Sequence, residues 1–121
     1  MQVSKKVIHP NIKKQIYDLL YKVVADLKNP EEAKEFLTSF LGKNEREAIT
    51  RRLGIAYLLN KGKTYSYIKK NLMVSSTTVA TVAKEAKKSQ GFKIALEKIK
   101  ADEWADKWAQ KIGQIFSKKT K

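Results

Sequence analysis

Apolar residues recur three and four positions apart along almost the whole chain of 121 residues. Ile12, Ile16 and Leu19 begin this pattern, and Ile112 and Ile115 end it. Such spacing places apolar side chains on one face of a helix. No stretch alternates with a period of two for long enough to predict a strand, and glycine and proline are few. The sequence therefore predicts an all-α fold.

We expect six helices joined by short connections, which is typical of a compact single domain over residues 1–121. The expected helices span residues 10–28, 30–41, 44–60, 64–71, 75–88 and 92–116. Asn29 followed by Pro30 is a typical helix start, and Asn44 with Glu47 approximates another. Glycine is expected to end the second and third helices and to break the chain before the last one, at Gly42, Gly62 and Gly91.

Positive charge is concentrated in one part of the chain. The formal net charge is +14, and the window from Lys61 to Lys93 holds eight lysines and a single acid, Glu85. A localised positive surface on a small helical unit suits a polyphosphate partner. We therefore expect the protein to bind double-stranded DNA.

Other classes find little support in the composition. No apolar run approaches the length of a membrane span, and the first residues lack the apolar stretch of a secretory signal. We expect a cytoplasmic, bacterial-type protein associated with the nucleoid. The chain has no cysteine, which excludes disulfides and thiolate metal sites, and its single histidine, His9, is not interpreted as a metal ligand. No cofactor is expected.

No catalytic group of residues is found either. Asp102, Glu103 and Asp106 lie among lysines and are interpreted as salt pairs within one helix. No glycine loop that could cradle a phosphate and no nucleophile beside a base occurs in the sequence. We therefore expect a protein that is not an enzyme.

Residues 63–88 predict a helix-turn-helix. Ile68 and Leu72 would face the core from the first helix, Val74 would fill the turn, and Val79 and Val82 would anchor the second helix. Short hydroxylated side chains then face outward at the start of that helix, with lysines toward its end. This order suits base contacts first and phosphate contacts after them.

The expected DNA contacts fall into two groups. Base-reading residues are Ser76, Thr77, Thr78 and Thr81. Phosphate-binding residues are Lys63, Lys69, Lys70, Ser75, Lys84, Lys87 and Lys88. Basic arms could add phosphate contacts, through Lys5 and Lys6 at one end and Lys118, Lys119 and Lys121 at the other.

Several short motifs resemble the tryptophan repressor family, and more closely its small relatives of unassigned effector. They are the run Glu45-Arg46-Glu47-Ala48-Ile49, the G-K-T-Y segment at 62–65 and Val74-Ser75 followed by Thr78-Val79. The similarity covers about residues 10–99. It implies a six-helix, intertwined homodimer that presents two helix-turn-helix units to successive major grooves. Residues 10–62 would then form the core and dimerisation helices, 91–116 the C-terminal helix and 117–121 a basic tail.

The chain departs from that family at the turn and at the effector pocket. Met73 stands where glycine is usual, so we expect a differently shaped turn. In the resemblance, Arg52 matches one arginine of the tryptophan pocket and is a candidate effector contact. Thr81 replaces the other arginine, Val82 the glycine under the indole, and Glu85 a serine near the ligand carboxylate. We therefore expect that L-tryptophan is not the effector. Whether a different small molecule acts as the effector is left open by the sequence.

The function predicted from the sequence is a sequence-specific transcription regulator, a repressor, that reads the major groove with residues 75–88. One alternative is an architectural or replication-associated DNA binder. Another is a protein-interaction module that docks through the last helix, where Trp104, Trp108, Ile112 and Ile115 share one face. That stripe is more simply interpreted as packing on the first helix or across a dimer interface.

Overall fold

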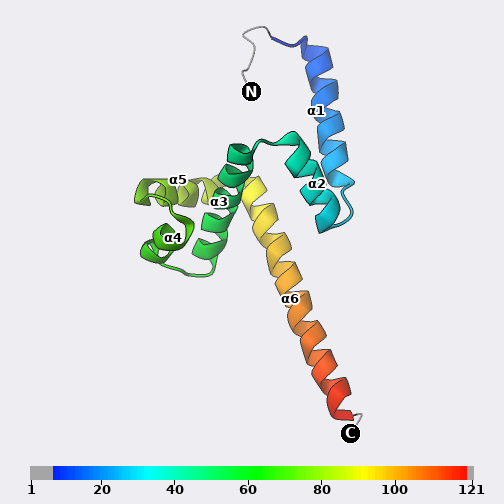
Figure 1. Ribbon diagram of the computed structural model, residues 1–121, viewed down its shortest axis with the longest axis vertical. Coiled ribbons are helices and arrows are strands. Elements are labelled where there is room, and N and C mark those ends of the chain that lie inside the picture. The colour runs from blue at the N-terminus through cyan, green and yellow to red at the C-terminus, as the bar shows by residue number, and fades with distance from the viewer. Residues whose placement is uncertain (1–6, 120–121) are drawn as a thin grey trace. The chain divides into compact units, whose positions relative to one another are not determined.

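The computed structural model describes residues 7–119, with side chains described as far as Ile115, and this range is entirely helical apart from its connections (Figure 1). The six helices are α1 Pro10–Ala25, α2 Pro30–Phe40, α3 Lys43–Asn60, α4 Tyr65–Leu72, α5 Ser76–Lys88 and α6 Gln90–Lys119. The predicted all-α fold with six helices is confirmed. The basic arms at Lys5, Lys6 and Lys121 lie outside the described residues, as do the side chains of Lys118 and Lys119.

The chain divides into two compact units between Arg46 and Glu47. The first unit contains α1, α2 and the start of α3. Its α2–α3 connection is held by Arg46, whose guanidinium donates hydrogen bonds to the carbonyl oxygens of Leu41 at 2.5 Å and Thr38 at 3.2 Å. The single domain over residues 1–121 remains a prediction.

Asn29 separates α1 from α2. Its side-chain oxygen accepts a hydrogen bond from the Glu32 backbone N–H at 2.8 Å, as an N-cap should. The prediction that the first helix continues to residue 28 is wrong, because the helix ends at Ala25. Asn29 has an extended backbone, as the residue before a proline usually does. The residues between Ala25 and Asn29 form the connection between the two helices.

No residue of α1 or α2 is buried. The apolar stripe predicted for α1 has side chains that are between 41% and 61% exposed, at Ile12, Ile16, Leu19, Leu20, Val23 and Val24. A helix with so much apolar surface in water needs a covering surface. The stripe exists as predicted, but the described chain does not bury it.

The start of α3 differs from the prediction. The helix begins at Lys43, so Asn44 is not its cap, and the Gly42 backbone N–H donates instead to Glu45 Oε1 at 2.9 Å. The preceding helix ends at Phe40, before Gly42, because Leu41 is already extended. At the other end Gly62 stops α3 as predicted, with φ +80°.

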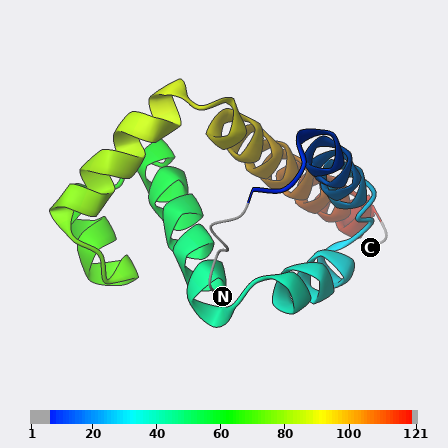
Figure 2. The ribbon, with the colours of Figure 1, turned by 90° about the horizontal axis from the view of Figure 1, so that it is seen from above.

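The core of the second unit joins α3, α4 and α5. Ile55 and Ala56 of α3 pack with Ile68 of α4 and with Val79 and Val82 of α5, and all five are buried. Figure 2 shows α4 and α5 on the same side of α3. The inward positions predicted for Ile68, Val79 and Val82 are confirmed.

Met73 makes the turn between α4 and α5. Its backbone is left-handed, with φ 54° and ψ 52°, and its N–H donates to the Lys69 carbonyl. The expectation of a differently shaped turn is therefore wrong, because Met73 itself adopts the conformation that usually calls for glycine. Its side chain is 80% exposed.

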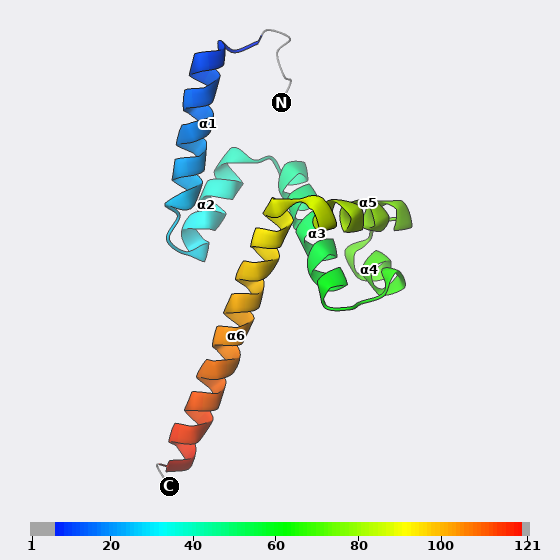
Figure 3. The ribbon, with the colours of Figure 1, turned by 180° about the vertical axis from the view of Figure 1, so that it is seen from behind.

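The last helix begins earlier than predicted. Ser89 is extended and forms the break, while Gly91, predicted to be the break, is already helical. The helix continues to Lys119, beyond the predicted end at residue 116. Figure 3 shows its C-terminal half extending beyond α3, α4 and α5.

Candidate nucleic-acid interface

The outward face of α5 carries the predicted base-reading residues. Val79 and Val82 are buried beneath the helix, while Ser76, Thr77, Thr78 and Thr81 are exposed on it. The helical period explains this division for Thr77 and Thr81, which lie on the opposite side of a 3.6-residue turn from the two valines. The face that α5 presents to solvent is therefore lined by hydroxyl groups.

These hydroxyls are not equivalent. The Ser75 hydroxyl caps α5 by accepting from the Thr78 N–H at 3.1 Å, and it lies 2.9 Å from the Thr78 hydroxyl. Thr81 Oγ1 donates to the Thr77 carbonyl at 2.9 Å, which leaves its oxygen able to accept. Thr78 and Ser75 therefore share in the cap, whereas the hydroxyl of Thr81 is bonded one turn back along the exposed face.

The predicted phosphate-binding lysines are all exposed and lie at three places in this unit. Lys84, Lys87 and Lys88 follow the hydroxyl face of α5. Lys69 and Lys70 line a concave surface of about 460 Å³ with Ser66, Met73 and Val74, beside the turn. Lys63 precedes α4 and holds its ammonium 4.9 Å from the centre of the Tyr67 ring. The structure thus brings these cations around α4 and α5.

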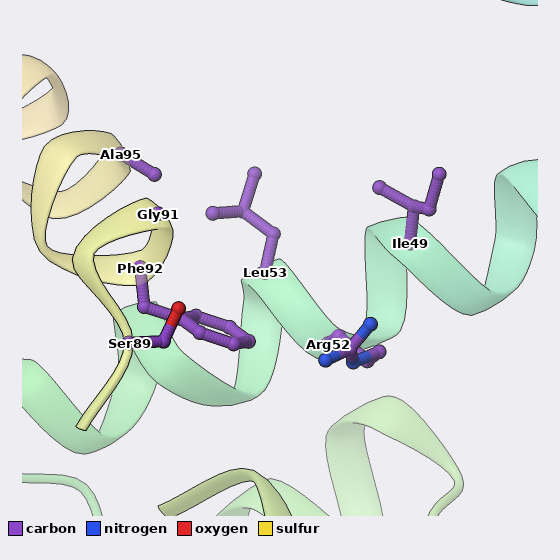
Figure 4. Close-up of a pocket in the computed structure, with 7 residues that line it drawn as sticks. All are labelled: Ile49, Arg52, Leu53, Ser89, Gly91, Phe92 and Ala95. Atoms are coloured by element: carbon purple, nitrogen blue, oxygen red, sulfur yellow. The ribbon is translucent and has the colours of Figure 1, made fainter. Parts of the chain in front are cut away.

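A second concave surface, of about 330 Å³, lies between α3 and the start of α6. Figure 4 shows its lining residues, which are Ile49, Arg52, Leu53, Ser89, Gly91, Phe92 and Ala95. Arg52, the candidate effector contact, lies at its edge, with its guanidinium carbon 5.4 Å from the centre of the Phe92 ring. Its Nη2 forms an ion pair with Glu85 Oε2 at 2.7 Å. Arg52 therefore already holds a carboxylate from its own chain.

A polar cluster between α3 and α6 was not predicted. Glu103 accepts hydrogen bonds from the Tyr57 hydroxyl at 2.7 Å and from Lys61 Nζ at 2.5 Å. The ion pair of Glu103 is made with Lys61 and not with a lysine of its own helix as predicted, although Lys107, four residues along α6, also attracts its carboxylate. Lys61 directly follows α3 and lies four residues after Tyr57, so the two side chains lie on the same side of the chain. Nothing in the sequence indicated that α6 would face them.

Among the described residues, no three histidine, aspartate or glutamate side chains come together as a metal site would require. None of the helices in this part of the chain combines the length and hydropathy needed to cross a bilayer. His9 caps α1, where its Nδ1 accepts from the Asn11 N–H at 3.3 Å.

A sequence model of the family described as Trp repressor protein matches residues 15–100. The chain belongs to the Trp repressor protein family. No curated protein and no solved structure gives a significant match. The Trp repressor family consists of DNA-binding helix-turn-helix regulators, and the match spans both α4 and α5. It ends before Trp104, so the exposed tryptophans of α6 lie outside the region that the Trp repressor model describes.

Proposed function

We propose that this protein is a sequence-specific transcription regulator, acting as a repressor, that reads the major groove with α5. The observation that carries the proposal is the position of Thr77 and Thr81, which are exposed on the side of α5 away from the buried Val79 and Val82. Threonine hydroxyls can hydrogen-bond to base edges, and threonine methyls can contact the thymine methyl. Ser76 and Thr78 would complete the base-reading set.

The lysines around this face would position the protein on the phosphate backbone. Lys84, Lys87 and Lys88 would contact one strand beyond the base-reading residues. Lys63, Lys69 and Lys70 would contact the backbone beside α4, with Ser75 at the start of α5. Lysine is a hydrated point charge that suits phosphate and carries no sequence information itself. Specificity would therefore come from the hydroxyl face and affinity mainly from the cations.

A homodimer is the form in which we propose that the protein acts. The apolar stripe of α1 and the absence of buried residues in α1 and α2 support this proposal, because a second subunit would cover that surface. Two copies of α5 would then lie about 34–36 Å apart, one turn of DNA. The target should accordingly be a near-palindrome, and the protein would act where the chromosome lies, in the cytoplasm. We propose no enzymatic activity.

In vitro selection of bound duplexes tests this proposal. The wild type should recover a near-palindromic consensus. Replacing both Thr77 and Thr81 with alanine should bring its affinity for the selected duplex close to that for a shuffled duplex, while non-specific affinity changes little. Broad enrichment of AT-rich sequences without a consensus would indicate an architectural or replication-associated binder instead.

A matched control comes from α2. Thr38 is exposed and its hydroxyl donates to the Lys34 carbonyl at 2.6 Å, the same bond to the residue four positions earlier that Thr81 makes. Thr38→Ala should leave both affinities as in the wild type. If Thr77→Ala with Thr81→Ala weakens binding to both duplexes equally, α5 does not read bases.

The exposed tryptophans of α6 favour one other function, a protein-interaction module. Trp104 and Trp108 are 63% and 48% exposed, with ring centres 5.6 Å apart. In a module that only docks proteins, the lysines would be solvated surface residues without a role in DNA binding. Such a module should not retard a random duplex in a gel shift at low salt. Retardation of that duplex by the wild type and by Trp104→Ala with Trp108→Ala alike would favour the DNA-binding role.

A further inference from the structure

Arg52 of α3 contacts two other helices at once. Its guanidinium forms the ion pair with Glu85 of α5 at 2.7 Å and lies against the Phe92 ring at the start of α6. Figure 4 shows Phe92 projecting from α6 beside α3, close to Arg52. Stacking on the Phe92 ring limits the positions that the Arg52 guanidinium can take. The ion pair has hydrogen-bond geometry, so the guanidinium in turn fixes the position of the Glu85 carboxylate. The Arg52 side chain thus links α3 to both α5 and α6.

Glu85 is placed where it can set the rotation of α5 about its own axis. It follows Thr81 by four residues, so it lies one turn farther along nearly the same side of the helix. The buried contacts of α5 come from Val79 and Val82, and apolar burial is non-directional. The hydrogen bonds of Ser75, Thr78 and Thr81 stay within the helix and its cap, whereas Glu85 reaches another helix.

The charge of Glu85 supports a positioning role. It is the single acid among eight lysines between Lys61 and Lys93, in the part of the chain proposed to meet phosphates. A free carboxylate there would repel DNA. The Arg52 guanidinium compensates this charge and turns the carboxylate into a link between α3 and α5. An acid that served only to solvate the surface would have no such compensation.

We propose that Arg52 and Glu85 are positioning residues for DNA recognition, and that their ion pair holds α5 in its reading orientation without a small-molecule effector. This inference rests on the proposed function and adds a mechanism to it. The carboxylate that engages Arg52 is supplied by α5 itself. A carboxylate ligand would have to displace Glu85 before it could bind Arg52.

The experiment uses full-length variants that break and restore the pair. These are Arg52→Gln, Glu85→Gln, the two combined, and the exchange of Arg52→Glu with Glu85→Arg. The measured quantity is the ratio of two dissociation constants, for a shuffled duplex and for the duplex selected by the wild type. A change in net charge alters both constants alike and cancels in the ratio.

We expect each single variant to lower this ratio by about three- to tenfold, since an exposed pair contributes little in each of two subunits. The combined variant should be no worse than either single variant. The exchanged pair should recover part of the ratio, because it restores the ion pair but not the stacking of a guanidinium on Phe92. Lys61→Gln is the matched control, because it breaks the ion pair that joins Lys61, directly after α3, to Glu103, and it should leave the ratio unchanged. Melting temperatures should stay within about 5 °C of the wild type, which excludes unfolding as the cause.

The outcomes separate the two proposals. If the wild type itself shows no preference for any duplex, the proposed function fails and the positioning role fails with it. If the wild type discriminates and the Arg52 and Glu85 variants keep the same ratio, the positioning role alone is overturned. A lowered ratio that the exchanged pair does not recover also overturns it, because the effect would then belong to the individual residues and not to their pairing.

Discussion

The Tyr57 hydroxyl donates a hydrogen bond to Glu103 Oε1 at 2.7 Å and so joins α3 to α6. Lys61 Nζ binds the other oxygen of the same carboxylate at 2.5 Å. Glu103, the α6 partner in both contacts, lies outside the family match, which ends at residue 100. The cluster therefore fixes a part of α6 that lies outside the family match to residues that lie within it.

Acid should weaken this cluster. The Lys61 ammonium and the Tyr57 hydroxyl, through their hydrogen bonds, hold the pKa of the Glu103 carboxyl below its ordinary range. A carboxyl with a lowered pKa in the folded state adds stability above the pKa of the unfolded chain, and that stability is lost as the pH falls through the folded-state pKa. The melting temperature of the wild type should therefore fall more steeply below about pH 4 than that of Glu103→Gln. Parallel curves would contradict this assignment.

Alkali should weaken the same cluster from the other direction. The hydrogen bond to Glu103 raises the pKa of Tyr57 and that of Lys61. Groups with a raised pKa add stability that is complete below their unfolded-state pKa and is lost as the pH rises through the folded-state values. Above about pH 10, the melting temperature of the wild type should fall further than that of the double variant Tyr57→Phe with Lys61→Gln. Equal losses would show that these two groups do not govern alkaline stability.

Met73→Gly should stabilise the protein. A residue with a side chain in the left-handed region costs about 1–2 kcal/mol, which exceeds the extra chain entropy that glycine loses on folding. The exposed side chain of Met73 contributes little packing that would be lost. We expect the free energy of unfolding to rise by about 1 kcal/mol in chemical denaturation. Met73→Ala keeps the backbone penalty and should show no such gain; an equal gain would assign the effect to the removed side chain.

DNA binding should depend steeply on salt. If about four of the proposed lysines engage phosphates in each subunit, the slope of log K against log salt should be roughly −7 for the dimer. Replacing Lys84 with glutamine should make the slope shallower by about 2, since each dimer loses two contacts. Lys22→Gln in α1 is the control and should leave the slope unchanged. A slope near zero for the wild type would contradict the phosphate contacts.

L-Tryptophan should not act as an effector. Arg52 is engaged with Glu85, Val82 is buried in the core, and Thr81 takes the place of the second arginine expected from the family resemblance. Loss of one guanidinium contact and repulsion by a carboxylate should each cost on the order of 1–3 kcal/mol of binding free energy. Calorimetry should show no saturable binding at micromolar tryptophan, and DNA affinity should not change on adding it. Saturable heat would refute the prediction.

The sequence alone determined the features that depend on neighbouring residues. Asn29 could be recognised as a cap because a cap acts within one turn of its helix. Val79 and Val82 could be placed inward, and Thr77 and Thr81 outward, because the period of 3.6 divides one helix into faces. The prediction failed locally at Asn44 and Gly91, where each helix begins one residue before the residue that favours a boundary.

The tertiary structure decided which faces meet. Glu85 and Arg52 are 33 positions apart, and Glu103 and Lys61 are 42 apart. Periodicity shows on which side of a helix each residue lies, but not which helix lies opposite, because that depends on turn geometry and packing far along the chain. The left-handed Met73 likewise became evident only in the fold, where the packing of α4 and α5 on α3 imposes a turn that methionine by itself does not favour.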